Sequence, residues 1–327
     1  MILILSRQDD GSTTSVIEWL SKFNKNFIRI NTDDSRTKFE YLDIDKKIFS
    51  VLHEGSRINL FDCSSIWHRR RGFSLKNIEL DWSKLRQKIF FDTSNYQETH
   101  INSEFKVLTE YFHYILENGI PTLGNYKSTD VNKLTVLNIA KKNKLKVPKS
   151  FVITTKRQLE QILNDSKKSY FITKSIGQGI YHFTDSYGYY TYTERIKNDS
   201  LKTLPSNFFP SLIQEEVIKK YELRIFYLKG KFYSMAIFSQ NKAETIVDFR
   251  KYSGETPQRK VPYSLPYHIQ QSLKKTMEEL ELDTGSIDMI VSKNNEYVFL
   301  EVNPVGQFGM TSLPCNYYLE KKIAETL

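Results

Sequence analysis

Two alternating runs near the end of the chain, SIDMIVSKNNEYVFLEVNP at residues 286–304, strongly limit the fold. Alternation places apolar side chains on one face of a strand and the remaining side chains on the other. We expect Asn294-Asn295 to form a two-residue hairpin turn, because Asn tolerates the positive φ that a type I′ turn requires. With that turn, Asp288 lies directly opposite Glu301. The sequence therefore predicts an antiparallel hairpin with two carboxylates side by side.

The second strand of this hairpin is expected to be polar on one face. Glu301 and Asn303 would project together, because residues two apart share a face. Tyr297 and Phe299 would lie on the same face as Glu301. The side chains of Val298, Leu300 and Val302 would be buried in the core. Opposed like charges are destabilising unless something compensates them. A surface strand with a polar rim and a Mg²⁺ site are both open interpretations, and we favour Mg²⁺, which prefers carboxylate and amide oxygens.

Composition and charge indicate a multidomain protein with an anionic partner. The chain has 327 residues and is 39% hydrophobic, which predicts a large core and more than one domain. The charges of residues 1–120 cancel, so the whole net charge of +9 falls after residue 120. We expect nucleotide phosphates and an acidic substrate as the anions, and no nucleic acid, because no nucleic-acid-binding motif accompanies the basic region.

Nothing in the sequence predicts a membrane or secreted protein. It contains no run of 18 apolar residues, and MILILSRQDD lacks the basic residues that open a signal peptide. Cys63 and Cys315 lie far apart with no Cys-x-x-Cys pattern, which is typical of packing residues in a reducing cytoplasm. We therefore expect a cytoplasmic protein with no membrane contact.

The order of the elements predicts an α/β fold. The first six residues form a strand, and STTSVIEWLSKF forms a helix capped by Ser12 or Thr13. Further helices are expected at residues 94–118, about 128–143, 156–166 and 266–281. The segments NFIRINTDD, VPKSFVIT and SYFIT are expected to be strands.

A glycine-containing stretch, KSIGQGIYHF at residues 174–183, follows one of these strands. It lacks the Gly-Lys-Ser/Thr ending of a Walker A loop, and no helix follows it as a dinucleotide-binding fingerprint requires. An ordinary hairpin and a phosphate lid formed by Lys174, Gly177 and Gly179 are both open interpretations. Lys133, in the helix DVNKLTVLNIAKKN, is either a solvated surface residue or a second phosphate ligand.

These motifs, taken in order, resemble the ATP-grasp ligases over nearly the full length of the chain. DVNKLTVLNIAKKNKLKVPKSFVIT resembles the helix of the first lysine, FITKSIGQG the second lysine and its glycine loop, and IQEEVIKKYELRIF the hinge. The resemblance implies an α/β (α+β) three-domain architecture. Its parts would be an N-terminal α/β pre-ATP-grasp domain at 1–120, a central lid domain at 121–210, and a C-terminal domain with the ATP and Mg²⁺ site at 211–327.

The resemblance also implies a role for each site residue. The residues expected to contact ATP phosphates are Lys133, Lys174, Arg224 and the loop glycines Gly177 and Gly179. The Glu215 carbonyl and the Val217 amide would meet the adenine edge, and Glu222 the ribose hydroxyls. The implied Mg²⁺ ligands are Asp288, Glu301 and Asn303.

A narrower resemblance links the chain to the graspetide ligases, the microviridin-type and grasp-with-spasm peptide maturases. It rests on SIWHRRRGFS, FSQNKAETIVDFRKY and EVNPVGQFG, and the chain departs from it at His68, where we expect a tyrosine. The resemblance implies a homodimer that uses ATP to activate Asp or Glu side chains of a ribosomally made precursor peptide with an acidic core. The acyl phosphate would then close an ester with Ser or Thr.

Two other function classes are open. One is an ATP-grasp ligase that forms an amide, either as a lactam or by adding an amino acid to a peptide or small acid. The other is a non-enzymatic nucleotide-binding module, which the complete set of cations and acids argues against. Incubation with ATP and a candidate precursor separates the three classes by mass.

The arginines allow more than one interpretation. Arg224 and Arg250 lie in apolar, strand-like runs, where a guanidinium group needs a partner. For Arg250 that partner is either the neighbouring Asp248 or a carboxylate of the substrate, bound in bidentate fashion. We expect the basic run at residues 69–71 to be solvated or to lie at a dimer interface, with precursor binding as the alternative.

Overall fold

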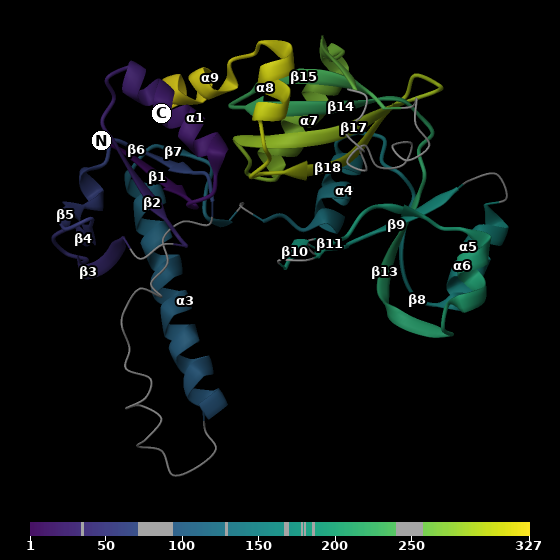
Figure 1. Cartoon of the computed structure of the whole chain (residues 1–327), viewed down its shortest axis with the longest axis horizontal. Helices are drawn as coiled ribbons and strands as arrows, with labels where there is room; N and C mark the ends of the chain where they lie inside the picture. Colours follow the sequence, from purple (N-terminus) through teal and green to yellow (C-terminus); the bar gives the residue numbers. More distant parts are fainter. Residues whose placement is uncertain are drawn as a thin grey trace. The chain divides into compact units, whose positions relative to one another are not determined.

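The computed structural model describes all residues except 34–35, 71–93, 128–129, 167–169, 178, 180, 185–186 and 240–257. The chain forms two compact units, both built from sheets and helices (Figure 1). Unit 1 consists of Met1–Thr129 and Tyr318–Leu327, and unit 2 of Asp130–Tyr317. The predicted α/β class is therefore confirmed. Within the described residues, no helix combines the length and the apolar composition needed to cross a bilayer.

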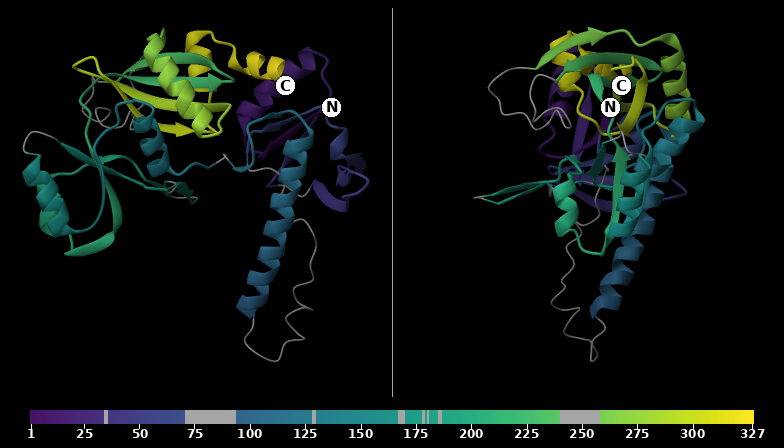
Figure 2. Two further views of the ribbon diagram at one scale, coloured as in Figure 1. Left: turned by 180° about the vertical axis from the view of Figure 1, so that it is seen from behind. Right: turned by 90° about the vertical axis from the view of Figure 1, so that its right-hand side faces the viewer.

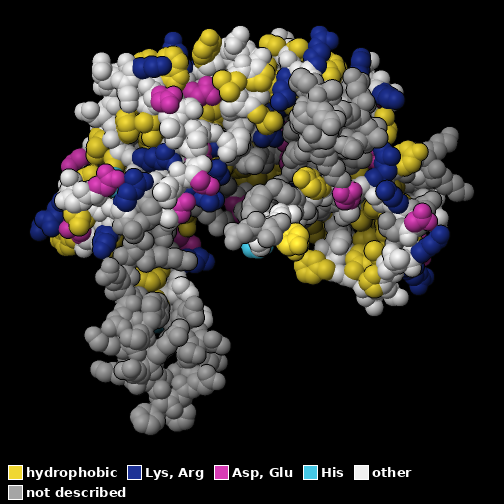
Figure 3. Space-filling model, viewed as in Figure 1, with side chains coloured by type: hydrophobic (Ala, Val, Ile, Leu, Met, Phe, Trp, Pro, Cys, Tyr) yellow, Lys and Arg dark blue, Asp and Glu magenta, His cyan; other side chains and the backbone are white. Residues whose placement is uncertain are grey.

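Unit 1 is built on a parallel sheet with the strand order β2-β1-β6-β7. The elements of this layer are β1 (Ile2–Ser6), α1 (Gly11–Lys22), β2 (Phe27–Asn31), β6 (Ser65–His68) and β7 (Thr122–Leu123). Every residue of β1 is buried, as is typical of a parallel strand covered on both faces. Acidic and basic side chains are interspersed on the visible described surface of this unit, in agreement with the balanced charge of its sequence (Figure 3).

A long helix and a small antiparallel sheet complete the core of unit 1. They are α3 (Ser94–Gly119), which confirms the predicted helix, and β3 (Thr37–Asp43), β4 (Ile48–His53) and β5 (Ser56–Asn59), followed by the short helix η1 (Leu60–Asp62). The rings of Phe49 and Phe112 lie 4.4 Å apart between β4 and α3. Helix α3 continues well past the sheets of its own unit (Figure 2).

Helix α1 begins two or three residues earlier than the sequence predicted. Its N-cap is Asp10, whose side chain accepts a hydrogen bond from the Thr13 amide at 3.3 Å. The predicted cap, Ser12 or Thr13, is wrong, and the hydroxyl of Thr13 is instead bonded to Ser6 Oγ at 2.8 Å. An aspartate is as good an N-cap as a serine, so the two interpretations were close in free energy.

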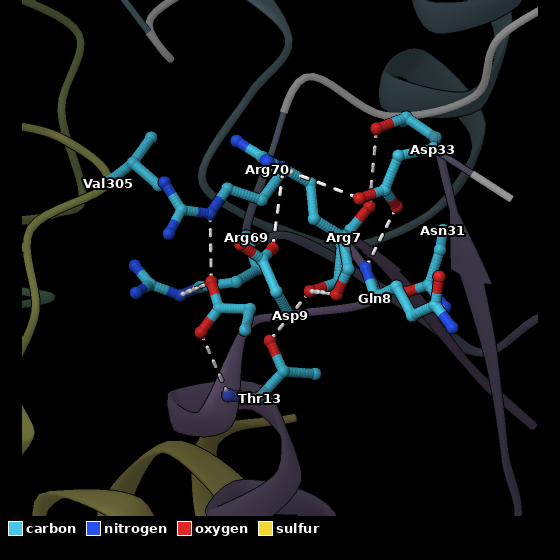
Figure 4. A network of polar contacts seen from close by, with 12 residues as sticks. Arg7, Gln8, Asp9, Thr13, Asn31, Asp33, Arg69, Arg70 and Val305 are labelled. Carbon is cyan, nitrogen blue, oxygen red and sulfur yellow. Dashed lines mark hydrogen bonds and ion pairs between the residues drawn. The ribbon is translucent and has the colours of Figure 1, made fainter. Parts of the chain in front are cut away.

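The same Asp10 carboxylate holds two arginines of the basic run, Arg69 and Arg70, which Figure 4 labels within a network of polar contacts. Asp10 Oδ2 lies 3.1 Å from Arg69 Nε and 2.8 Å from Arg70 Nε, and the side chains of Asp10 and Arg69 are 0% and 4% exposed. Burial raises the pKa of Asp10, but the charges of Arg69 and Arg70 outweigh it, so the pKa lies below 3.8. The expectation of solvated arginines is wrong for Arg69, because a buried carboxylate compensates it. Arg71 lies outside the described residues.

Unit 2 contains a five-stranded antiparallel sheet with the order β16-β15-β14-β17-β18. Its strands are β14 (Lys219–Leu228), β15 (Lys231–Phe238), β16 (Arg259–Tyr263), β17 (Thr284–Ser292) and β18 (Tyr297–Asn303). Helices α4 (Lys133–Lys142) and α7 (Tyr267–Glu279) bury their apolar residues against one face. On the other face, Cys315 of α8 (Gly309–Cys315) packs on Met235 and Ile237 of β15. The polar side chains of β14, β17 and β18 lie on this second face, beside α8.

Unit 2 also contains a smaller antiparallel sheet, with the order β12-β9-β13-β8. Its elements are β8 (Ser150–Thr155), α5 (Lys156–Asp165), β9 (Phe171–Lys174), β12 (Glu194–Arg195), α6 (Asn198–Thr203) and β13 (Asn207–Glu215). The hairpin β10 (Tyr181–Phe183) and β11 (Gly188–Tyr190) lies between β9 and β12 in the chain. A capping box at Thr155 and Gln158 starts α5, which packs Leu159 on this sheet.

The last described helix returns to unit 1. Helix α9 (Leu319–Thr326) packs against α1, and its residues Leu319, Ile323 and Ala324 are buried. Lys25 Nζ donates to the Ala324 carbonyl at 2.9 Å, and Ser65 Oγ donates to the Leu327 carbonyl at 2.8 Å. Unit 1 is therefore assembled from two segments that are far apart in the sequence.

Candidate active site

The hairpin of β17 and β18 places Asp288 directly opposite Glu301, as predicted. The route differs from the prediction, because the turn has three residues, with Asn295 at φ 61° and Ser292 N donating to the Glu296 carbonyl at 2.9 Å. A three-residue turn of this kind shifts the pairing by one residue. A bulge between the Asp288 and Met289 positions then restores the predicted pair. Two deviations from the predicted hairpin cancel at the carboxylates.

The bulge also corrects the predicted faces of β18. Phe299, expected beside Glu301, is 0% exposed and lies in the core of the opposite face, against which Tyr297 also packs. Leu300, expected in the core, lines the cavity described below, whereas Val302 does lie in the core. An extra residue in a strand exchanges the two faces on either side of it, which is the physical reason for the difference.

A row of charged residues crosses the three adjacent strands β14, β17 and β18. Arg224 pairs in register with Asp288, and Asp288 with Glu301. Arg224 Nη1 donates to Asp288 Oδ1 and Oδ2 at 2.7 and 2.5 Å, and the two side chains are 12% and 20% exposed. Direct cross-strand neighbours are close enough for this contact without any loop rearrangement. The sheet register therefore fixes the position of both carboxylates.

Two lysines from other elements approach the Glu301 end of this row. Lys174 Nζ, at the end of β9, lies 3.8 Å from Glu301 Oε2, and Lys133 Nζ, at the first residue of α4, lies 4.0 Å from it. Helix α4 packs along β18, which brings its first turn to the edge where Glu301 projects. Asn303, on the next strand position of the same face, accepts a hydrogen bond from the Val305 amide at 3.1 Å.

These residues line a cavity of about 460 Å³ within unit 2. Most of the predicted site residues border it: Lys133, Lys174, Gly179, Glu215, Val217, Glu222, Arg224, Asp288, Glu301 and Asn303. Gly177 does not border it. Arg250 and Asp248 lie outside the described residues. A volume of this size is typical of a small-molecule site.

The strand connection between β13 and β14 supplies one wall of the cavity. The amides of Glu215 and Glu216 donate to the carbonyls of Lys149 and Tyr170, both at 2.8 Å. The Val217 amide makes no hydrogen bond to any residue in the described part of the chain. A main-chain donor at a cavity wall is able to hydrogen-bond the edge of a planar base, and the contact of Val217 with adenine stays a prediction.

Lys219 is a cavity residue that the sequence analysis missed. It is 5% exposed and forms an ion pair with Glu222, three positions later on the same strand. Residues three apart on a regular strand face opposite sides, but β14 has a register shift between Lys219 and Tyr221 that turns both charges to one face. The only signal in the sequence was the charged run IKKYE, in which Lys219 is the first lysine. The position of a bulge cannot be predicted from such a pattern.

The donors of this site fit a hard dication and a polyphosphate. Asp288, Glu301 and Asn303 offer only oxygen atoms, which suits Mg²⁺ and not zinc or copper. Two carboxylates in direct register are unfavourable alone, and here the cations Arg224, Lys133 and Lys174 balance them. The same cations are of the kind that bind phosphate oxygens. The residues present could therefore hold both Mg²⁺ and a nucleotide.

Comparison with known proteins gives matches to solved structures. No family model and no curated protein matches the sequence. The macrocyclase MdnC of Microcystis aeruginosa MRC, bound with the precursor peptide MdnA, is 26% identical, with a TM-score of 0.78 over 100% of this chain and 99% of its own. A RiPP-associated ATP-grasp ligase of Chryseobacterium gregarium, in complex with ADP and a leader and core peptide, is 23% identical, with a TM-score of 0.78 over 99% and 94% of the two chains.

A third match is more distant in sequence. The ATP-grasp ligase PsnB, complexed with a phosphomimetic variant of its minimal precursor, Mg and ADP, is 13% identical, with a TM-score of 0.71 over 99% and 96% of the two chains. All three matches extend along essentially the whole of this chain, so both units take part in the likeness. The mixed α/β fold of the ATP-grasp ligases that the sequence resemblance implied is confirmed, and its division into three domains stays a prediction.

Proposed function

We infer that this chain is an ATP-grasp ligase of the graspetide type, because peptide-bound macrocyclases and ligases match it over its whole length. We propose that it activates Asp or Glu side chains of a ribosomally made precursor peptide and closes intramolecular esters with Ser or Thr. The observation that carries the proposal is the charged row Arg224–Asp288–Glu301, with Lys133 and Lys174 beside it.

The reaction follows from the charges that this site provides. A peptide carboxylate attacks the γ-phosphorus of ATP, ADP leaves, and an acyl phosphate forms. A Ser or Thr hydroxyl then attacks the acyl carbon, loses its proton, and inorganic phosphate leaves as the ester forms. Lys133, Lys174 and Arg224 would offset the charge on the phosphoryl oxygens, which is the main catalytic requirement of such transfers. Mg²⁺ held by Asp288, Glu301 and Asn303 would supply further charge neutralisation.

Nucleotide binding would exchange ionic partners within the cavity. Arg224 pairs with Asp288, and both lysines approach Glu301. When Asp288 and Glu301 bind Mg²⁺ and the arginine and lysines bind phosphate, each charged side chain replaces one partner of opposite charge by another. The site therefore stays electrically balanced before and after binding, which limits the cost of desolvating it.

The peptide would be recognised through its carboxylates. We propose Arg250 as the residue that docks the reacting or a neighbouring carboxylate, since a guanidinium fork matches a carboxylate in bidentate geometry. The net charge of +9, all of it after residue 120, supports a precursor with an acidic core. Arg250→Ala should then leave ADP affinity nearly unchanged and reduce cross-linking about tenfold or more. Equal loss of both would favour the pairing with Asp248.

The direct test uses mass spectrometry. The purified chain is incubated with ATP, Mg²⁺ and a candidate precursor peptide rich in Thr and Asp or Glu. The proposal predicts the loss of one water for each cross-link, together with release of ADP. An increase in mass would instead show addition of a building block, and an unchanged mass with nucleotide binding would show a binding module. Asp288→Asn serves as the inactive variant, and Glu296→Gln, on the same hairpin, as the active control.

Ester and amide products are separated by their stability to base. A side-chain ester is cleaved by mild alkaline hydrolysis, which restores the water and the original mass, whereas a lactam survives. Replacing every Lys of the precursor leaves ester formation intact and abolishes lactam formation. A base-stable product that requires Lys would overturn the ester proposal and favour the amide alternative.

We further propose a cytoplasmic homodimer. The free, buried thiols of Cys63 and Cys315 and the need for ATP support the cytoplasm. Val107 and Tyr114, seven positions apart on α3, are 63% and 62% exposed and give this helix an apolar stripe that a second copy could cover. Light scattering coupled to size exclusion measures the assembly, and Val107→Glu should shift it toward the monomer.

A further inference from the structure

A cluster of two histidines and a glutamate lies inside unit 1, whereas the ATP cavity is formed by residues of unit 2. His68 is the last residue of β6, and His113 and Glu117 lie four apart on α3. That spacing places both helix residues on one face. One ligand atom from each of the three residues lies within 4.8 Å of the others. The cluster contains His68, the position at which this chain departs from the predicted family pattern.

The histidines of this cluster are buried and lack the hydrogen bonds that buried polar groups normally make. His68 and His113 are 4% and 2% exposed. Neither nitrogen of either ring has a hydrogen-bond partner among the residues that the structure describes. The nearest ionic contact joins His68 Nε2 to Glu117 Oε1 at 3.4 Å. Buried polar side chains almost always have a partner, and a bound ion would supply one to both rings.

The distances between the ligand atoms of the three side chains are close to those around a bound metal ion. Ligand atoms around a tetrahedral zinc ion, at bonds of about 2.0–2.1 Å, lie roughly 3.4 Å apart. The observed His68–Glu117 separation of 3.4 Å matches this value. The largest separation within the cluster is below 4.8 Å, so a small rotation of one ring would close the remaining gap.

The surroundings hold two of the three side chains in place. The Tyr126 ring stacks on His113 at 3.9 Å with an interplanar angle of 4°. The Tyr126 amide donates to Glu117 Oε1 at 2.5 Å. Gly124 adopts φ +72°, and a Cβ there would lie 3.0 Å from the His68 carbonyl oxygen. The loop before residue 127 thus packs tightly on the cluster and supplies the kind of supporting contacts that orient metal ligands.

We propose that His68, His113 and Glu117 bind a divalent transition-metal ion, preferably zinc. The bound ion would link strand β6 to helix α3. Two imidazoles and one carboxylate are a donor set that zinc binds well, in contrast to the oxygen-only donors of the ATP cavity. The His68 side chain is 0% exposed, so no substrate can reach the ion from that side. Its function is structural. It would cross-link two elements that flank residues 71–93 in the chain.

The proposal is tested with the purified full chain in the absence of nucleotide. The protein is treated with a zinc-selective chelator, dialysed, and titrated with ZnCl₂ in excess Mg²⁺, so that the ATP cavity does not contribute. We expect about one zinc per chain by elemental analysis and a rise of several degrees in the melting temperature, since a metal that binds only the folded state stabilises it. Co²⁺ in place of zinc should give the visible absorption of a four-coordinate site.

Variants decide whether this cluster holds the ion. Glu117→Gln and His113→Asn should each weaken zinc binding at least tenfold and abolish the zinc-dependent rise in melting temperature. Glu110→Gln, an exposed position of the same helix, and Asp288→Asn in the ATP cavity should keep both. The proposal is overturned if the wild-type chain binds neither zinc nor Co²⁺. Retention of the ion by Glu117→Gln and His113→Asn would overturn it equally.

Discussion

Replacing Glu301 by glutamine should separate the two roles that its carboxylate has in the cavity. Without nucleotide it lies 3.8 Å from Lys174 Nζ and 4.0 Å from Lys133 Nζ, and the side chain is 35% exposed. Partly exposed pairs of this kind contribute about 0.2–1 kcal/mol each. Their loss should lower the melting temperature by no more than a few degrees. The Glu301→Gln protein is therefore expected to fold normally.

The same substitution should have opposite effects on nucleotide binding with and without Mg²⁺. In EDTA, ADP should bind to the variant about two- to thirtyfold tighter than to the wild type. The reason is that neither lysine then has to give up its contact with the Glu301 carboxylate, which contributes about 0.2–1 kcal/mol for each pair. In Mg²⁺, the variant should lose the metal-dependent gain in affinity. Cross-linking should fall by about a thousandfold if the charged ligand supplies roughly 4 kcal/mol of the several that a catalytic metal provides.

Titration calorimetry with ADP in EDTA and in Mg²⁺, run beside precursor-stimulated ADP release, measures all of these quantities. Glu296→Gln is the matched control, because it makes the same change on the same hairpin, where the carboxylate pairs with Lys146 at the surface. Weaker ADP binding to Glu301→Gln in EDTA would refute the partner exchange. Near-normal turnover at limiting Mg²⁺ would refute the assignment of Glu301 as a metal ligand.

Lys133→Ala and Lys174→Ala should each reduce both ADP release and cross-linking at least about tenfold. Full precursor-stimulated ADP release by either variant would show that its lysine takes no part in the reaction. Asp10→Asn keeps a good N-cap but leaves Arg69 buried without its carboxylate. Urea titration should therefore show that the free energy of unfolding falls by about 3–5 kcal/mol. A decrease below about 1 kcal/mol would contradict the buried ion pair. Burial lowers the pKa of His68 from 6.5 to about 3 and that of His113 from 6.5 to about 4. Without added metal, the unfolded state therefore binds more protons than the folded state below pH 6.5. The free energy of unfolding should then fall as the pH falls toward 4. Urea titrations at several pH values check this, and an unchanged midpoint would contradict it.

The sequence was sufficient for the elements with strong periodicity and for most of the cavity. The strands at residues 2–6 and 27–31 and the helix at 94–119 follow from local alternation and spacing. The existence of the last hairpin follows from alternation too, but its Asp288–Glu301 pair was predicted through a turn and a register that the structure does not have. Such patterns are local, and the hydrophobic faces that they encode are buried in the folded chain. Bulges are different, because they depend on how two strands twist against each other. The shifts in β14 and β18 were therefore not predictable, although they set which side chains face the cavity.

Polar contacts between residues that are far apart in the sequence were the second feature that could not be predicted. No local pattern joins Asp10 to Arg69, because only the order of the strands β1 and β6 brings them together. The helix spacing of His113 and Glu117 was visible, but the third member, His68, lies on a strand 45 residues earlier. A pair of ligands four apart on a helix is a weak signal until a third residue is found. Tertiary structure alone supplies that residue.

The return of the chain to unit 1 has a consequence for its synthesis. The ribosome completes Asp130–Tyr317 as one continuous segment, so unit 2 can fold as soon as that segment has emerged. Unit 1 lacks Leu319, Ile323 and Ala324 of its core until α9 is made. Its first 129 residues must wait, with part of their apolar surface open, while unit 2 is translated. At about 5–20 residues per second that delay is roughly 10–40 seconds, during which the nascent N-terminal segment would be a natural client for chaperones.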